Sequence, residues 1–138
     1  MKKKGILQLV FFAIALLLVS PAIAQNESVV TLSGNAYITS GQTAFIDEDH
    51  SAIRNWNDKE TVISFYFRTT ESGNMNIALQ AKGKSRIEVS LLGKKKKVTL
   101  NSETLSRIEL GTFKIKNPGY VKVDVRGLKI NEGDDFGS

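Results

Sequence analysis

Apolar and polar residues alternate along much of the chain with a period of two residues. In the segment 61–70, Ile63, Phe65 and Phe67 fall on one face, and the residues between them fall on the other. This period, together with aromatic and β-branched residues, is typical of a β-strand. Both faces of the segment are rather apolar, so we expect a central strand of a sheet.

The same alternation predicts further short strands separated by turn residues. No segment keeps the 3.6-residue period of a helix over three turns. The further predicted strands cover residues 28–32, 36–39, 45–46, 75–81, 85–91, 97–100, 107–115 and 120–126. Breaks are expected at 82–84 and 102–106, a bulge at Gly111, and a long loop over 47–59. Short strands with turns about every 8–12 residues predict an all-β, antiparallel β-sandwich of the jelly-roll, galactose-binding-like kind.

The N-terminus predicts a secretory signal peptide. Residues 1–5 are basic, residues 6–19 are apolar apart from one glutamine, and Ala22 and Ala24 form a small-residue cleavage signal. The apolar run is too short for the ~20 residues that span a membrane as a helix. We therefore expect one domain over residues 25–138, secreted or periplasmic, with no stable membrane anchor after cleavage.

The signal peptide changes the meaning of the charge. The chain has 19 basic and 14 acidic residues, a net charge of +5, and Lys2, Lys3 and Lys4 contribute three of these charges. Four of the remaining basic residues form one run, 94–97, at a predicted hairpin tip. Nucleic-acid-binding proteins usually spread their charge over a face. We expect a solvated basic turn and no nucleic-acid partner; contact with an anionic lipid or envelope polymer is the open alternative.

Residue types that support catalysis are scarce. The absence of cysteine excludes disulfides, thiolate zinc sites and cysteine nucleophiles. His50 is the only histidine, and no serine-nucleophile motif accompanies it. Glu88, Glu109 and Asp124 each have a basic residue two positions away on the same predicted face, which favours ion pairs over a glycosidase pair. We therefore expect a protein that is not an enzyme.

Two acidic clusters are the only candidates for metal binding. They cover residues 47–49 and 132–135, and carboxylate oxygens are the ligands that calcium prefers. The first cluster lacks the glycine of an EF-hand loop. We expect solvated loops and no metal or cofactor, with a structural calcium held by Asp47, Asp49 and Asp134 as the weaker alternative.

Two groups of residues have the chemistry of a sugar site, which needs an aromatic platform and polar groups. Trp56 lies in the long loop beside Asn55 and Asn57. The alternative for Trp56 is packing on the core beside Ile53. The second group shares one predicted strand face: Tyr66, Arg68, Asn76, Gln80, Arg86 and Glu88. We take Trp56, Asn55, Asn57, Tyr66 and Arg68 as candidate ligand-binding residues.

Several stretches resemble one family: Gly34–Ile38, Asn55–Trp56, Ser64–Phe67 and Pro118–Leu128. They resemble a secreted bacterial domain of unknown function, of the Bacteroidota type, that usually precedes a larger uncharacterised module. The likeness covers most of residues 30–137. It implies a carbohydrate-binding-like jelly-roll sandwich with no catalytic residues.

The resemblance also implies a further strand after the glycine-rich segment that follows the last long strand. Here Ser138 ends the sequence, so we expect the domain to lack its final strand. The open sheet edge would then accept a downstream module or a partner strand. The function predicted is a non-catalytic accessory module that binds a glycan or polysaccharide. The alternative is a structural or protein-interaction domain with no small ligand.

Overall fold

The computed structural model describes residues 27–130 and 134–138 of the chain. The predicted signal peptide and part of the second acidic cluster lie outside these residues. Among the residues described, no helix has the length and apolar character needed to cross a membrane.

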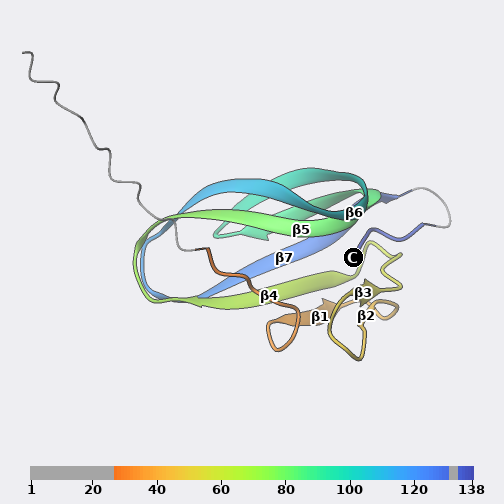
Figure 1. Ribbon diagram of the computed structural model, residues 1–138, viewed down its shortest axis with the longest axis horizontal. Coiled ribbons are helices and arrows are strands. Elements are labelled where there is room, and N and C mark those ends of the chain that lie inside the picture. The colour runs from red at the N-terminus through yellow and green to blue at the C-terminus, as the bar shows by residue number, and fades with distance from the viewer. Residues whose placement is uncertain (1–26, 131–133) are drawn as a thin grey trace, which may run out of the picture.

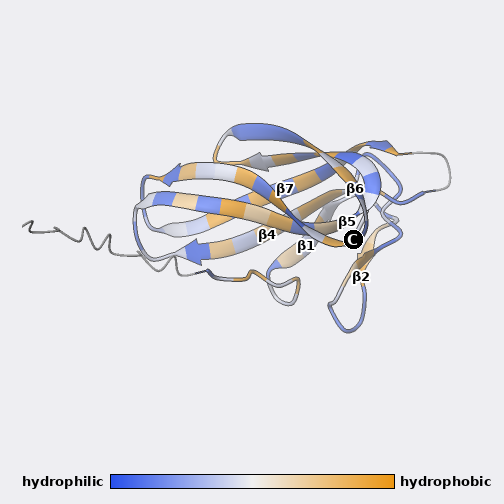
Figure 2. Cartoon of the chain, turned by 45° about the horizontal axis from the view of Figure 1, so that its top comes forward, coloured by the Kyte–Doolittle hydropathy of each residue, from blue (hydrophilic) through white to orange (hydrophobic). Residues whose placement is uncertain are grey.

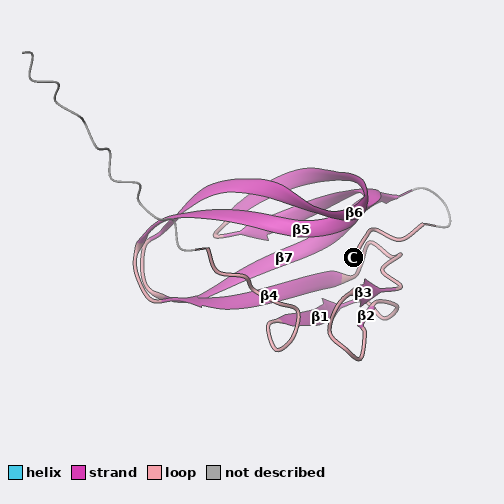
Figure 3. Cartoon of the chain, viewed as in Figure 1, coloured by secondary structure: helices cyan, strands magenta, loops and turns pink. Residues whose placement is uncertain are grey.

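All regular structure in the described residues is β-strand (Figure 3). The strands are β1 (Ala36–Ser40), β2 (Phe45–Ile46), β3 (Ile53–Arg54), β4 (Val62–Thr69), β5 (Gly73–Leu91), β6 (Lys94–Ile115) and β7 (Gly119–Ile130). Five of them form one sheet in the order β1-β4-β7-β5-β6, and β2 pairs with β3 (Figure 1). Every pair is antiparallel, which confirms the predicted all-β, antiparallel class.

Strands β5 and β6 are longer than the sequence pattern predicts. The breaks expected at 82–84 and 102–106 are bends inside continuous strands, not turns between strands. Ala81 pairs with Ser106 and Gly83 pairs with Ser102, so residues 103–105 have no partner in β5. Extra residues on one strand bend a hairpin sharply, which explains why the alternation is interrupted there. The strand predicted over 28–32 is absent, whereas the bulge expected near Gly111 is present.

The bend makes the β5–β6 hairpin double back over the sheet. Residues 85–91 of β5 pair with both β6 and β7, but the first half of β5 pairs only with β6. The two halves of β6 therefore face each other, and the Lys96 Nζ donates to the carbonyl oxygens of Glu109 and Leu110 at 3.1 and 3.0 Å. Strand order and the bend together leave one outer face on the five-stranded sheet.

The core is built from alternate residues of the long strands, as the two-residue period predicts. Figure 2 shows hydrophobic and hydrophilic residues alternating along the strands. In β7 the buried residues are Val121, Val123 and Val125, and Ile63 of β4 and Ile87 of β5 are completely buried.

The last described segment closes one end of this core. Phe136 is completely buried, and its ring centroid lies 5.3 Å from that of Trp56. A Cβ on Gly127 would overlap the ring of Phe136, so the absence of a side chain there makes room for it. Ser138 pairs with Lys82 through two backbone hydrogen bonds, which fixes the segment against β5.

Candidate functional site

The outer face of the five-stranded sheet gathers polar and aromatic side chains. Because Val121, Val123 and Val125 of β7 are buried, the residues between them point away from the core. Pairing places Tyr66 opposite Lys122 and Arg68 opposite Tyr120. We call this surface the outer face. It includes Tyr37, Thr39, Ser64, Tyr66, Arg68, Tyr120, Lys122 and Asp124.

All three tyrosines of the chain lie on the outer face. Tyr37 of β1 is 51% exposed, Tyr120 of β7 is 80% exposed, and Tyr66 of β4 lies half-buried between them. The rings of Tyr37 and Tyr66 meet edge to face, with centroids 5.8 Å apart. Tyr66 lies one strand and two residues along from Tyr37, and Tyr120 lies one strand and two residues along from Tyr66. Each step therefore covers roughly 8 Å. The three form a line that crosses three strands diagonally, which we call the tyrosine diagonal.

A hydrogen-bonded group of polar side chains lies beside the tyrosine diagonal. The hydroxyl of Ser64 donates to Asp124 at 2.6 Å and lies 2.8 Å from the hydroxyl of Thr39. Asp124 also pairs with the Lys122 ammonium at 3.1 Å. The hydrogen bond to Asp124 raises the pKa of Lys122, with a smaller contribution from the adjacent Tyr66. A carboxylate and an ammonium are thus held in place next to the central tyrosine.

The structure separates the residues that the sequence grouped on one face. Tyr66 and Arg68 do lie on the outer face, and register places Glu88 and Arg86 of β5 on it as well. Asn76 and Gln80 do not, because they belong to the first half of β5, beyond the bend. That half pairs only with β6, so the expectation of a single polar face spanning all these residues is wrong.

Trp56 is buried and does not present a stacking surface. Its side chain is 3% exposed and packs against Phe136, so the packing alternative describes it and the stacking role does not. Its indole Nε1 has no hydrogen-bond partner within the described part of the chain. Phe136 itself gave no signal in the sequence, because a single aromatic residue in a glycine- and aspartate-rich segment has no period.

Asn55 and Asn57 brace the loop that precedes β4. The Asn55 amide donates to the Thr43 carbonyl oxygen at 3.0 Å and the Asn57 amide donates to Asn55 at 3.2 Å. Thr43 in turn donates to Asp58 at 2.6 Å. The hydrogen bonds from Thr43 and Thr61 lower the pKa of Asp58. These amides therefore hold the loop between β3 and β4 and do not belong to the strands that carry the tyrosine diagonal.

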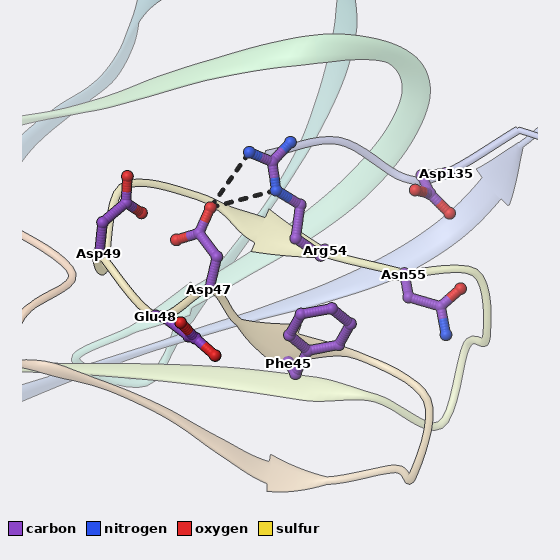
Figure 4. A pocket seen from close by; sticks show the side chains of 7 residues that line it. All are labelled: Phe45, Asp47, Glu48, Asp49, Arg54, Asn55 and Asp135. Atoms are coloured by element: carbon purple, nitrogen blue, oxygen red, sulfur yellow. Dashed lines mark hydrogen bonds and ion pairs between the residues drawn. The ribbon is translucent and has the colours of Figure 1, made fainter.

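An open hollow lies at the β2–β3 hairpin (Figure 4). It is lined by Phe45, Asp47, Glu48, Asp49, Arg54, Asn55 and Asp135. Phe45 is 53% exposed, so this hollow, and not Trp56, carries the accessible aromatic ring of the loop region. The period of two would have placed Phe45 outward, since its neighbour Ile46 packs against the core.

Asp47 organises the loop beside this hollow. Its carboxylate accepts hydrogen bonds from the backbone amides of Ala52 and Ser51, both at 2.9 Å, and pairs with Arg54 at 3.1 Å. The hydrogen bond from Ala52 is the main cause that lowers the pKa of Asp47 to about 2. Its acceptor capacity is used within the loop.

The residues of the calcium alternative do not come together. Within residues 27–130 and 134–138, no three His, Cys, Asp or Glu side chains are placed to hold one metal ion. Asp47 and Asp49 line the hollow together with Asp135. Asp134, the third residue of the calcium alternative, does not line it.

The basic run at the start of β6 makes contacts within the protein. The ammonium of Lys94 lies 5.7 Å from the ring centroid of Phe113, and that of Lys95 lies 3.4 Å from Glu88. Lys96 donates to the two carbonyl groups of β6 named above. Lys95 thus links β6 to β5, and Lys94 and Lys96 link the two halves of β6.

The sequence pattern alone does not predict that Tyr37 and Tyr120 lie beside Tyr66. Tyr120 was expected to point outward, but only the pairing of β7 with β4 shows that it adjoins Tyr66. Tyr37 joins them because β1 pairs with the other edge of β4. Strand order is a long-range property, which alternation within one strand does not encode.

Fold and surface together define a small antiparallel β domain with a tyrosine-bearing outer face. The chain belongs to the family described as domain of unknown function DUF5077, which matches residues 30–138. This confirms the part of the resemblance that concerned a domain of unknown function. No curated protein matches the chain.

Proposed function

We propose that this domain is a non-catalytic module that binds a glycan along the tyrosine diagonal. The observation that carries the proposal is the placement of all three tyrosines in one line on an exposed sheet face. Tyrosine offers an apolar ring for the C–H surface of a sugar and a hydroxyl for its polar groups. The line crosses three strands, so it suits an extended chain better than a single small sugar.

The neighbouring polar groups supply the hydrogen bonds that orient a sugar. Arg68 lies opposite Tyr120, and Lys122 lies opposite Tyr66 with its partner Asp124. Ligand sites combine apolar contact with a few fixed polar groups. Because Ser64 and Asp124 are already hydrogen-bonded, part of this polar set is positioned before a ligand arrives.

We also propose the cellular location and the role of the module. We infer a secreted or periplasmic accessory module that is not an enzyme, supported by the basic, apolar and A-x-A order of residues 1–24. We also infer a carbohydrate-binding-like jelly-roll sandwich of the Bacteroidota type. Its support is the resemblance in sequence and the long hairpin that doubles back over the sheet.

Affinity electrophoresis through gels that contain neutral, acidic or amino polysaccharides tests the proposal. We expect at least one polysaccharide to retard the chain. Tyr37→Ala and Tyr120→Ala should each weaken this binding roughly 2- to 10-fold, since one aromatic contact contributes about 0.5–1.5 kcal/mol. Both residues are exposed, so the fold should survive.

Phe45→Ala is the matched control, because it removes an exposed aromatic ring from the hollow and leaves the outer face intact. It should bind like the unmodified chain. Binding that is lost with Phe45→Ala but kept with both tyrosine variants would move the site to the hollow. The absence of retardation by any polysaccharide would reject glycan binding.

A further inference from the structure

Among the residues that the structure describes, the first half of β5 has one unpaired edge. Residues 73–84 pair with β6 on one side only, whereas residues 85–91 pair with β6 and β7 on the two sides. No described residue forms a strand along the second side of residues 74–80. We call this side, from Asn74 to Gln80, the β5 edge.

Ser138 already occupies the position at which a strand would enter this edge. The amide of Lys82 donates to the Ser138 carbonyl oxygen at 3.0 Å, and the amide of Ser138 donates to the Lys82 carbonyl oxygen at 3.1 Å. This reciprocal pair is an antiparallel bridge on the side away from β6. It sets a register: the backbone groups of Asn76, Ala78 and Gln80 face the same side as those of Lys82, since the direction alternates along a strand.

The β5 edge is neither short nor charged, and its one irregularity, between Ile77 and Ala78, comes from an extra residue, Leu110, on the β6 side. Native edge strands are usually short, bulged or charged, which prevents them from pairing with other chains. β1 is short and has an irregularity before Ser40, and the exposed half of β6 begins with the basic run 94–97. Lys96 donates to two carbonyl groups of the second half of β6, those of Glu109 and Leu110. Residues 73–81 contain no charged residue and no proline.

The inner side of this edge is incompletely covered. Met75, Ile77 and Leu79 point toward the core but are only half-buried. Phe65 and Phe67 of β4 are half-buried as well. The doubled-back layer has two strands against the five of the sheet, so one more strand would cover apolar surface on the inside and meet polar Asn74, Asn76 and Gln80 on the outside.

We propose that the β5 edge accepts one β-strand from a partner polypeptide. The strand runs antiparallel to β5, continues the register of the Ser138–Lys82 bridge, and carries apolar residues at alternate positions to contact Ile77 and Leu79. Backbone hydrogen bonds supply the affinity and the alternate side chains supply the specificity. This inference is independent of glycan binding, because the outer face belongs to other strand segments.

Amide hydrogen exchange on the full chain is the first test. The amides of Asn76, Ala78 and Gln80 should exchange at least about tenfold faster than those of Met75, Ile77 and Leu79, which face β6. Equal protection of the two sets would show that the edge is not free and would overturn the proposal.

A tethered strand is the second test, because a covalent link supplies a high effective concentration. The sequence Val-Thr-Val-Thr-Val-Thr, appended after Ser138, places valine opposite Ala81, Leu79 and Ile77. The matched control, Thr-Val-Thr-Val-Thr-Val, has the same composition with its valines on the outer side. We expect the first extension to slow exchange at Ala78 and Gln80 at least about tenfold and to raise the unfolding midpoint, and the control to do neither.

Asn76→Pro separates edge pairing from other effects of the extension. The substitution is made in the chain that carries the first extension. It removes an amide that faces the edge and leaves the ladder with β6 intact. It should therefore abolish the protection that the extension gives to the neighbouring edge residues, without unfolding the chain. Equal behaviour of the two extensions, or no protection from either, would overturn the proposal. If protection of the edge amides in the unextended chain rises with protein concentration, the partner is a second copy of the chain. That result would overturn the assignment to a different polypeptide.

Discussion

At the scale of single residues, a few side chains hold the surfaces in place. Asp47 fixes the loop between β2 and β3 by accepting backbone amides, and Ser64 fixes Asp124 on the outer face. Phe136 fills the end of the core where Gly127 has no side chain. A single substitution at each of these residues can therefore test its contacts.

Asp47 makes the loop beside the hollow sensitive to acid. Its folded-state pKa, about 2, lies below the ordinary value of 3.8. A lowered carboxyl pKa stabilises the fold at pH values above the ordinary pKa, and this stabilisation is lost as the pH falls through the folded value. We expect the amides of Ser51 and Ala52 to lose exchange protection between about pH 4 and pH 2.

Asp47→Asn is the matched variant for this pH dependence, because it keeps the shape of the side chain and removes its charge. The variant should show weaker protection at pH 7 and no further loss down to pH 2. An acid-induced loss of the same size in Asp47→Asn would assign the effect to another group.

Gly127→Ala should destabilise the domain by overpacking the C-terminal segment. The added methyl group would overlap the ring of Phe136. Overpacking of this kind costs about 1–3 kcal/mol, measurable as a shift of the denaturant midpoint. The double variant Gly127→Ala/Phe136→Leu should be less destabilised than the sum of the two single variants. Simple additivity would contradict a direct contact between these residues.

At the scale of elements, the doubled-back hairpin determines which surfaces exist. Its bend moves Asn76 and Gln80 away from the outer face and leaves the β5 edge unpaired. The lysines of the basic run then connect the start of β6 to the second half of the same strand. A run that the sequence suggests as a solvated tip is in part a clamp between the two halves of a strand.

Lys96→Met tests this clamp. Loss of the hydrogen bonds to Glu109 and Leu110 should lower the free energy of unfolding by about 1 kcal/mol, because hydrogen bonds from charged donors contribute more than neutral ones. Lys97→Met is the control, since the Lys97 ammonium has no ion-pair or hydrogen-bond partner among the described residues. Equal effects of the two substitutions in chemical denaturation would show that Lys96 does not hold the two halves of β6 together.

At the scale of the whole molecule, local patterns predict strands but not their partners. The alternation in 61–70 and 120–126 predicts β4 and β7 and their outward residues. Gly83 and residues 102–106 interrupt the pattern because they form a bend, and a bend inside a strand looks like a turn in sequence. The burial of Trp56 depends on Phe136, which lies far along the chain, so only the folded structure could decide between packing and stacking.

The surface made by three strands is also a property of the whole molecule. Tyr37, Tyr66 and Tyr120 come from parts of the sequence that are far apart, and the order β1-β4-β7 brings them into one line. Glycan binding along this line therefore requires the order and register of all three strands.

Chemical-shift mapping by NMR tests that claim most directly. The probe is a soluble oligosaccharide prepared from a polysaccharide that retards the chain in affinity electrophoresis. We expect shifts that cluster on the backbone amides around Tyr37, Tyr66 and Tyr120, with smaller changes at Arg68 and Lys122. Shifts confined to the hollow around Phe45, with the amides of β4 and β7 unchanged, would contradict it.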